Sequence, residues 1–357
     1  MTPQAARAAV IAGAGYWLPP PVLTNEELGH RVGATAEWLH SRTGIIERHV
    51  TPPGMATADL AVEAGRKALM SAGTRRVDAV IVATATPNRI CPATAPEVAT
   101  RLDQAQIAAF DVGAACSGFL YSLAIAQGLI AIGQAGKVLV IGAETLTSIL
   151  DPQDRATSAI FADGAGAMVL RAGTADELGA IGPVILGSDG TGGDLIAVAA
   201  GGSRQPSATT PGSGPGSRFL SVSGPEVFRQ AVKHMAAVTH QALTAAGWQL
   251  GDVDRVFAHQ ANAHILTAVT RKLGVPPYRM ATNLRHIGNT SAASIPILLA
   301  QDAAHGLIKP GDRALLTAFG AGLTWAATTL TWPPLPHHTP VPGGEHPCPH
   351  RPPSCAG

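Results

Sequence analysis

The sequence contains few charged and few aromatic residues, and neither sign of charge prevails. Of its 357 residues, 14% are charged and 4% are aromatic, and the formal net charge is +1 at pH 7. Binding to nucleic acid or to acidic membranes usually depends on a strongly basic surface. The composition therefore predicts neither partner, and a basic group that binds a ligand must act locally.

Long hydrophobic runs are also missing. The run 119–132 is interrupted by Gln127 and Gly128 and falls short of the roughly 20 apolar residues that cross a bilayer. The first nine residues carry Arg7 and lack the apolar core and cleavage pattern of a signal peptide. We therefore expect a soluble, cytoplasmic protein.

Cysteine is scarce, and its spacing excludes two common uses. The four cysteines, which form no CxxC pair and no metal-ligand pattern, are Cys91, Cys116, Cys348 and Cys355. We expect no disulfide framework and no metal site among them, which leaves room for one reactive thiol.

Two catalytic motifs are absent as well. Gly13-Ala-Gly15 lacks the third glycine of a dinucleotide-binding fingerprint, and the prolines at 19–21 prevent the helix that should follow. No GxSxG segment occurs, so a hydrolase with a serine nucleophile on a strand-to-helix elbow is not expected.

What the sequence does contain is an internal repeat. Asp78 and Asp254 begin similar β-branched segments 176 residues apart, and Lys137 and Arg313 in later matching segments are separated by the same 176 residues. Each half reads as helix, strand, turn, helix, strand. This alternation predicts mostly parallel sheets and a pseudo-twofold, layered α/β/α/β/α structure. Chance similarity between Ala- and Val-rich segments is the alternative.

The repeat suggests a division of the chain. The N-terminal half spans residues 1–175 and the C-terminal half spans 176–333, and a flexible loop rich in Gly, Ser and Pro occupies 201–217. A Pro- and His-rich tail follows at 334–357. Its possible metal ligands are His337, His338, His346, His350, Cys348 and Cys355, although the proline content favours disorder with incidental histidines.

Cys116 is the first candidate for chemistry. It lies between a short apolar strand and an apolar helix that begins at Gly118. A thiol at a helix N-terminus is in a setting that favours the thiolate. The alternative is that this cysteine is a small buried hydrophobic residue.

Two further polar residues lie at comparable junctions. His259 follows the strand 253–258, and Asn289 lies in a turn of small residues before the apolar helix 295–304. In the repeat register, Cys116 falls opposite Ala292. Each residue could serve only as a cap or turn residue. If they converge, however, a thiol, an imidazole and an amide would surround one carbonyl group.

Four segments in this order resemble the β-ketoacyl-acyl-carrier-protein synthase III family. They are the segment around Cys116, His259-Gln-Ala-Asn262, Gly288-Asn-Thr-Ser-Ala-Ala-Ser294 and Phe319-Gly-Ala-Gly-Leu-Thr-Trp325. The resemblance covers about residues 9–332. It implies a duplicated thiolase fold with five α/β/α/β/α layers, and an expected catalytic triad of Cys116, His259 and Asn289.

The resemblance also implies a reaction. An acyl-CoA would acylate Cys116 while the backbone N–H groups of Cys116 and Ala321 hold the oxyanion. Malonyl-acyl carrier protein would then enter, and His259 and Asn289 would stabilise the enolate that forms as carbon dioxide leaves. The product would be a β-ketoacyl thioester that starts a fatty-acid or polyketide chain. No metal or organic cofactor is implied.

Coenzyme A contacts of the family match four positions: Trp38, Arg42, Arg155 and Asn262. An indole and a guanidinium can enclose adenine, and arginines neutralise phosphate. For Trp38 and Arg42, an amphipathic surface pair is the alternative. His264 departs from the family because an arginine is usual there, which puts the preference for carrier protein in doubt.

Partner contacts are the least specific part of the prediction. The basic residues expected to dock an acyl carrier protein are Arg229, Lys233, Arg271 and Lys272, although solvated helix faces look the same. The resemblance implies a homodimer in which Cys91 closes the acyl pocket of the neighbouring subunit. Its small side chain, with the long loop 201–217, suggests an acyl group larger than acetyl.

Two alternatives to condensation remain open on the sequence. One is transfer of an acyl group to a hydroxyl, amine or carrier-protein thiol without decarboxylation. The other is an inactive partner in a heterodimer. The presence of Asn289 favours condensation over simple transfer, because decarboxylation needs a donor beside the malonyl thioester.

Overall fold

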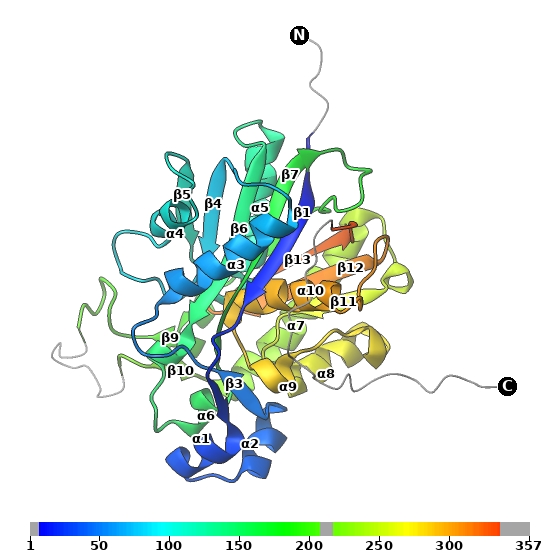
Figure 1. Cartoon of the computed structure of the whole chain (residues 1–357). Coiled ribbons are helices and arrows are strands. Elements are labelled where there is room, and N and C mark those ends of the chain that lie inside the picture. The colour runs from blue at the N-terminus through cyan, green and yellow to red at the C-terminus, as the bar shows by residue number, and fades with distance from the viewer. Residues whose placement is uncertain (1–6, 208–216, 336–357) are drawn as a thin grey trace.

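The computed structural model describes residues 7–207 and 217–335 and contains two β-sheets that face each other across a pair of helices (Figure 1). The first sheet has five strands in the order β1-β7-β6-β4-β5 and the second has four in the order β11-β12-β13-β8. The strands of the first sheet are β1 (Ala8–Trp17), β4 (Ala79–Ala83), β5 (Ala108–Val112), β6 (Lys137–Thr145) and β7 (Asp163–Gly173). Those of the second are β8 (Ile185–Ser188), β11 (Arg255–Ala258), β12 (Arg313–Gly320) and β13 (Thr324–Thr331).

The two sheets repeat one topology. Read from β8, the second sheet runs β8-β13-β12-β11, which is the order β1-β7-β6-β4 of the first. At the repeat positions, the N–H of Asp78 donates to the carbonyl of Lys137 over 2.8 Å, and the N–H of Asp254 donates to that of Arg313 over 2.9 Å. Each aspartate also accepts a 2.8 Å hydrogen bond from the N–H of that same partner. The predicted repeat is therefore confirmed at the level of individual hydrogen bonds.

The prediction of mostly parallel sheets is wrong. Strand β7 is antiparallel to β1 and to β6, and β13 is antiparallel to β12 and to β8. Strand β13 follows β12 after only three residues, 321–323, whereas a parallel crossover needs about a dozen or more. Parallel pairing is confined to β4 with its neighbours β5 and β6 and to β11 with β12.

Helices cover both sheets and separate them. The outer face of the first sheet carries α3 (Thr57–Ser71) and α4 (Ala95–Arg101), and that of the second carries α7 (Gly224–Ala246) and α8 (Ala263–Leu273). Between the sheets lie α5 (Gly118–Ala131) and α10 (Ser294–Ala304). A helix enclosed on all sides must be apolar all round, and α10 buries eight of its residues, including Ile295, Leu298 and Leu299. The five-layered α/β/α/β/α arrangement predicted from the sequence is confirmed.

Insertions extend each half at one end of the sheets. Between β1 and α3 lies a small cap, at the bottom of Figure 1, which consists of β2 (Val22–Thr24), α1 (Asn25–Val32), α2 (Ala36–Thr43) and β3 (Glu47–His49). The buried guanidinium of Arg48 ties this cap to the body, since it donates to the Asn25 Oδ1 over 2.8 Å and to the Ala159 carbonyl over 3.0 Å. The insertion of the second half contributes the hairpin of β9 (Ile196–Val198) and β10 (Leu220–Val222).

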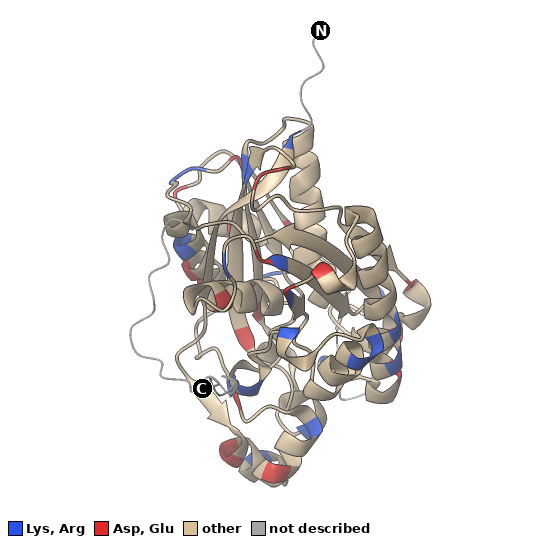
Figure 2. Cartoon of the chain, turned by 90° about the vertical axis from the view of Figure 1, so that its right-hand side faces the viewer, with Lys and Arg blue, Asp and Glu red and all other residues tan. Residues whose placement is uncertain are grey.

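Charged residues of both signs are scattered over the outer elements, as Figure 2 shows. None of the helices in residues 7–207 and 217–335 is long and apolar enough to cross a membrane. Within those same residues, no group of three or more His, Cys, Asp or Glu side chains is placed to hold a metal ion. Most of the predicted tail, from residue 336, lies outside the described residues.

Candidate active site

The two halves meet at a pair of matching elbows. Cys116 lies in the 3-10 turn η1 (Ala115–Ser117) before α5, and its counterpart Ala292 lies in η6 (Ser291–Ala293) before α10. In both elbows the residue before that position has a left-handed backbone, with φ of 43° at Ala115 and 48° at Ser291. The elbows pack against each other. Both central helices therefore start beside Cys116.

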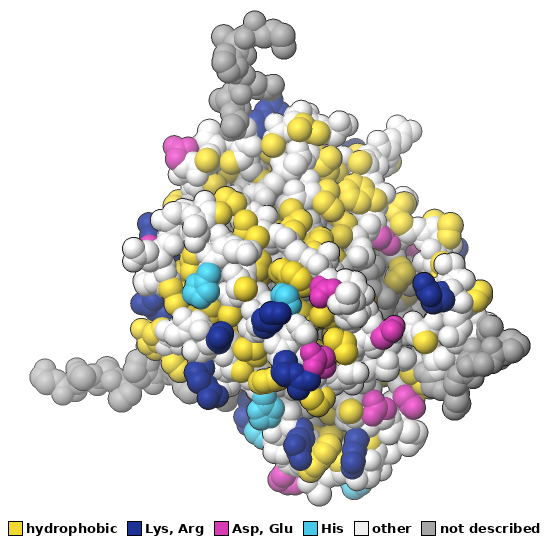
Figure 3. Space-filling model, turned by 180° about the vertical axis from the view of Figure 1, so that it is seen from behind, with side chains coloured by type: hydrophobic (Ala, Val, Ile, Leu, Met, Phe, Trp, Pro, Cys, Tyr) yellow, Lys and Arg dark blue, Asp and Glu magenta, His cyan; other side chains and the backbone are white. Residues whose placement is uncertain are grey.

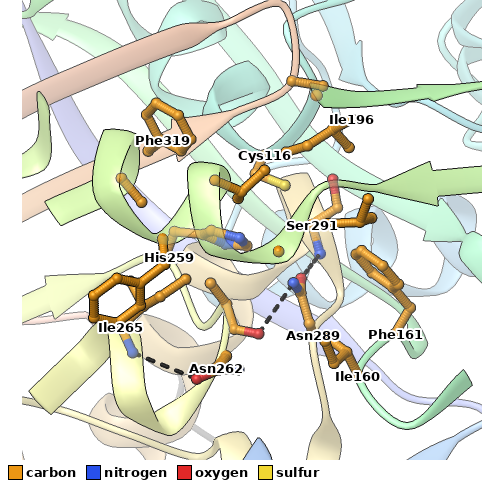
Figure 4. A pocket seen from close by; sticks show the side chains of 18 of the residues that line it. Cys116, Ile160, Phe161, Ile196, His259, Asn262, Ile265, Asn289, Ser291 and Phe319 are labelled. Atoms are coloured by element: carbon orange, nitrogen blue, oxygen red, sulfur yellow. Dashed lines mark hydrogen bonds between the residues drawn. The ribbon is translucent and has the colours of Figure 1, made fainter. Parts of the chain in front are cut away.

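A cavity of about 600 Å³ opens at these elbows (Figure 4). Cys116, His259 and Asn289 all line it, so three residues that are far apart in sequence share one space. The remaining wall is largely apolar and includes Leu146, Ile149, Ile160, Phe161, Ile196, Leu220, Val222, Phe228, Met235 and Phe319. Such a wall keeps water away from the polar groups and strengthens their electrostatic interactions.

The Cys116 thiol is enclosed by protein, with part of its surface open to the cavity. The pKa of Cys116 is raised to about 12, mainly by burial; the nearby carboxyl of Glu144 contributes to the increase, and a hydrogen bond with Ser291 opposes it. The helix N-terminus favours a thiolate at this position, whereas desolvation in the folded chain favours the neutral thiol. A thiol in this setting must lose its proton before it can act as a nucleophile.

His259 lies beside the thiol as a neutral base. Its ring is buried, with 2% of the residue exposed, and burial lowers the pKa of His259 to about 3. The backbone N–H donates to the carbonyl of Thr317 over 2.9 Å, and Nδ1 lies 2.8 Å from the Ser294 hydroxyl. Because Ser294 occupies Nδ1, Nε2 is the nitrogen that can serve a ligand in the cavity.

Asn289 is held by backbone and side-chain hydrogen bonds. Its N–H donates to the Ile160 carbonyl and its own carbonyl accepts from Ala162, each over 2.9 Å. The amide oxygen accepts from the N–H of Ser291 over 2.8 Å, and Nδ2 donates to the Ala261 carbonyl over 3.3 Å. The oxygen is thus engaged away from the cavity centre, and the second N–H of the amide can donate to a ligand.

The loop after β12 packs on the Cys116 elbow. The Thr324 hydroxyl donates to the carbonyl of Ala114 over 3.0 Å, and the Ser117 hydroxyl donates to the carbonyl of Thr324 over 3.1 Å. Ala321, in this loop, lines the cavity together with Cys116. The two residues predicted to supply an oxyanion hole therefore border the same space.

The predicted coenzyme A residues gather at the cap. The guanidinium carbons of Arg42 and Arg155 lie 5.6 Å and 4.9 Å from the centre of the Trp38 ring. Trp38 and Arg42 come from α2, and Arg155 begins α6 (Arg155–Ser158). Asn262 caps α8, accepting from the N–H of His264 over 2.7 Å. Arg42, Asn262 and His264 line the cavity, whereas Trp38 and Arg155 lie beside it.

The structure of one chain does not bring Cys91 to the cavity. This cysteine is exposed in the loop after β4, and it is absent from the cavity lining. A contact between Cys91 and an acyl group within the same chain is therefore not supported. The predicted contact is with the acyl pocket of a neighbouring subunit, and it stays a prediction.

The four predicted docking residues are exposed. Two of them lie on a helix segment that lines the cavity, and the other two lie at the far end of their helix. Arg229 and Lys233 belong to the part of α7 that lines the cavity, and Arg229 forms an ion pair with Glu226. Arg271 and Lys272 lie in the last turn of α8, whose first turn lines the cavity. Seen from behind, Lys and Arg side chains lie mainly on the lower half of the molecule, and hydrophobic side chains gather above them (Figure 3).

Sequence reasoning missed three polar residues around the triad: Ser291, Ser294 and Glu144. Ser294 fixes the His259 ring, Ser291 contacts Cys116, and Glu144 is a buried carboxyl at the end of β6. Glu144 carried a signal that could have been used, because it is a lone acid at the end of the apolar run Val138–Ala143. Such a residue rarely lies in a buried strand without partners.

Comparison with known proteins links this geometry to one family. Residues 110–190 match the family described as 3-oxoacyl-[acyl-carrier-protein (ACP)] synthase III, and residues 243–332 match its C-terminal part. The Streptomyces coelicolor protein β-ketoacyl-[acyl-carrier-protein] synthase III 3 is 52% identical over 329 residues, which are 92% of this chain and 98% of that protein.

Solved structures agree. The crystal structure of 3-oxoacyl-(acyl carrier protein) synthase III from Pseudomonas aeruginosa has a TM-score of 0.86 and 43% identity, over 92% of this chain and 99% of that one. The priming β-ketosynthase of the R1128 polyketide pathway has a TM-score of 0.87 and 33% identity, over 94% and 99% of the two chains.

Proposed function

Because the chain belongs to the 3-oxoacyl-[acyl-carrier-protein] synthase III family, we propose that Cys116, His259 and Asn289 carry out its priming condensation. The family reaction is an acyltransferase reaction that starts fatty-acid or polyketide synthesis from acyl-CoA and malonyl-acyl carrier protein. The observation that carries the proposal is the shared cavity, in which a thiol, a neutral imidazole and an anchored amide face one apolar space.

The first half-reaction is acylation of Cys116. Its sulfur attacks the thioester carbonyl of acyl-CoA, and the thiol proton passes through Nε2 of His259 to the departing coenzyme A sulfur. The products are acyl-Cys116 and free coenzyme A. Negative charge grows on the carbonyl oxygen in this step, and the N–H groups of Cys116 and Ala321 are the proposed donors to it.

The second half-reaction forms the carbon–carbon bond. Loss of carbon dioxide from the malonyl thioester leaves an enolate, whose oxygen accepts hydrogen bonds from Nε2 of His259 and Nδ2 of Asn289. For this step the neutral imidazole carries its proton on Nε2 and accepts from the Ser294 hydroxyl at Nδ1. This is the opposite tautomer from the one that takes up the thiol proton in the first half-reaction, and the Ser294 hydroxyl fits both because it can donate or accept. The enolate carbon then attacks acyl-Cys116, the bond between carbon and the Cys116 sulfur breaks as the β-ketoacyl thioester forms, and the thiolate that leaves takes up one proton from solvent.

Substrate delivery follows from the arrangement at the cap. Trp38 with Arg155 would hold adenine and Arg42 would hold phosphate, while Asn262 would contact pantetheine. For the acyl carrier protein, Arg229 and Lys233 are better placed than Arg271 and Lys272, because their helix segment lines the cavity. The reaction needs no metal or organic cofactor beyond the thioester itself.

We also propose a division of labour between the halves and a homodimer. Residues 1–175 supply the nucleophile, and residues 176–333 supply His259 and Asn289. Strand β5 is an edge strand with partly exposed residues, and Ile132 at the end of α5 is 77% exposed. Pairing of β5 with a second copy would cover this edge and could bring Cys91 towards the other cavity.

Intact-protein mass spectrometry tests the proposal. Wild type incubated with acyl-CoA should gain the mass of one acyl group, and Cys116→Ala should gain none. Addition of malonyl-acyl carrier protein should discharge the acyl group with release of carbon dioxide. In Asn289→Ala, acylation should persist while decarboxylation slows. Acylation of Cys116→Ala, or discharge without carbon dioxide, would contradict the assignment.

The same experiment tests the acyl preference inferred from Cys91. A panel from acetyl-CoA to longer and branched acyl-CoAs should favour the larger groups, because the small Cys91 side chain leaves space at the end of the pocket. Turnover restricted to acetyl-CoA would rule out this part of the proposal.

A further inference from the structure

A buried carboxyl near the nucleophile has no role in the reaction described above. Glu144, in β6, is fully buried. Its carboxylate accepts hydrogen bonds from the hydroxyl of Thr86 over 2.8 Å, from that of Thr84 over 3.2 Å and from the N–H of Ala85 over 3.0 Å. It thereby fixes the turn that follows β4, and Ala85 of that turn lines the cavity.

Ser291 connects this carboxyl to the nucleophile. Its hydroxyl lies beside the sulfur of Cys116 (Figure 4), and hydrogen bonding by this hydroxyl lowers the pKa of both the Cys116 thiol and the Glu144 carboxyl. Figure 4 shows the Cys116 sulfur between the ring of His259 and the hydroxyl of Ser291. The thiol therefore has a base on one side and a hydrogen-bonded hydroxyl on the other.

The internal repeat shows that the fold itself does not require an acid here. In the 176-residue register, the counterpart of Glu144 is Gly320 at the end of β12. Gly320 lies beneath the Cys116 elbow, and Glu144 lies beneath the Ser291 elbow. In the C-terminal half, β12 thus ends in a glycine beneath the Cys116 elbow. In the N-terminal half, β6 places a carboxyl beneath the Ser291 elbow. A buried ionisable group is costly to keep, and such groups concentrate at functional sites.

We propose that Ser291 and Glu144 are positioning residues for acyl transfer: Glu144 orients the hydroxyl of Ser291, and that hydroxyl holds the Cys116 thiol towards His259. This inference rests on the proposed function, because it concerns residues that act through the same nucleophile, Cys116. Neither residue exchanges a covalent bond with the substrate. The pair acts through the direction and protonation of the sulfur.

The charge of Glu144 gives the inference a distinctive signature. The groups that face its carboxyl from the β4 turn and from η6 are neutral: Thr84, Ala85, Thr86 and Ser291. The thiol of Cys116 on η1 is the titratable group whose pKa it raises. Burial raises the pKa of Glu144 to about 7, so above that pH its negative charge opposes formation of the thiolate. Ser291 acts in the opposite direction by stabilising the thiolate.

Two variants and one control separate these effects. Ser291→Ala removes the hydroxyl, and the backbone tolerates it because alanine adopts the same left-handed φ at Ala115, the counterpart of Ser291. Glu144→Gln keeps the shape and removes the charge. The control is Asp302→Asn, a carboxyl 4% exposed with a raised pKa that pairs with Arg255 and does not line the cavity. Thermal unfolding verifies that each variant is folded.

Two rates are measured on each protein by intact-protein mass spectrometry. The first is acylation of Cys116 by acyl-CoA in a single turnover. The second is alkylation of Cys116 by iodoacetamide at pH 9, which reports the thiolate fraction. Ser291→Ala should lower both rates, acylation by about tenfold. Glu144→Gln should slow acylation but speed alkylation, and Asp302→Asn should change neither.

A damaged fold would also slow acylation and would expose the thiol to iodoacetamide, so the opposite changes count only where thermal unfolding shows that Glu144→Gln is as fully folded as Asp302→Asn. The inference is overturned if wild type is acylated at Cys116 and both variants are acylated at the rate of Asp302→Asn. It is also overturned if alkylation falls in Glu144→Gln. If wild type itself is not acylated at Cys116, the proposed function fails instead, and the alkylation rates still test the link between Glu144, Ser291 and the thiol.

Discussion

Replacement of Gly320 by alanine should disable the nucleophile while leaving the protein folded. A Cβ at this position would lie 2.7 Å from the backbone nitrogen of Cys116, 3.1 Å from that of Ser117 and 3.2 Å from the Cα of Cys116. All three atoms belong to the backbone of the elbow. No side-chain rotation can relieve the contact, so the elbow and the end of β12 must separate.

The structure sets the size of the effect. Ordinary contacts of a Cβ begin at 3.4 Å, so the backbones must move apart by about 0.7 Å. A displacement of about 1 Å at a reacting group can cost about 10²-fold in rate. We therefore expect acylation of Cys116 to slow by about 10- to 100-fold, or about 1.4–2.7 kcal/mol of activation free energy. Overpacking of this kind typically lowers the free energy of unfolding by about 1–3 kcal/mol.

The assay is single-turnover acylation by acyl-CoA, with urea unfolding in parallel. Gly113→Ala is the matched control, because Gly113 lies three residues before Cys116 and a Cβ there would meet no atom within 4 Å. If Gly320→Ala is acylated at the rate of Gly113→Ala, the close approach of β12 to the elbow does not govern reactivity. The positioning argument for the oxyanion loop would then be refuted.

Three further predictions follow from other parts of the site. Because burial lowers the pKa of His259 to about 3, the imidazole is charged only below that pH. Malonyl decarboxylation by Glu144→Gln, which lacks the carboxyl with a pKa of about 7, should therefore show no step near pH 6.5, and a step in that variant would contradict a buried, neutral His259. Trp38→Ala should raise the KM for acyl-CoA by about fivefold, as expected for loss of about 1 kcal/mol of stacking, and leave the KM for an acyl-pantetheine unchanged; equal effects on both would place Trp38 elsewhere. Arg48→Met removes the donors to Leu23, Asn25 and Ala159 and should lower the free energy of unfolding by about 3 kcal/mol, measured in urea; an unchanged midpoint would mean that the cap is held by other contacts.

The repeat could be predicted from the sequence because it depends on local signals in a fixed register, whereas the convergence of Cys116, His259 and Asn289 is expected from the family resemblance. Asp78 and Asp254 each accept the same hydrogen bond from the first residue of a later strand, so the two aspartates recur in the sequence at a fixed spacing. Small residues before an apolar helix likewise indicate the elbow at Cys116 and the turn at Asn289.

Other features depend on the environment and have no local signal. The antiparallel direction of β7 and β13 is decided by how their connections return to the sheet. The neutral state of the Cys116 thiol is decided by enclosure from both halves, which outweighs the helix start that the sequence does reveal.

The duplicated architecture explains why one cavity can serve two different steps. Helices α5 and α10 occupy the central layer and begin at elbows that touch, so the positive ends of both helix dipoles point at the same space. Each half-reaction develops negative charge on a thioester oxygen, and both dipoles favour that charge in an apolar surrounding. The same surrounding keeps the resting thiol of Cys116 neutral. A half of the chain on its own would present one helix end and would separate Cys116 from His259 and Asn289, so the cavity that they share requires that both copies of the repeat pack together.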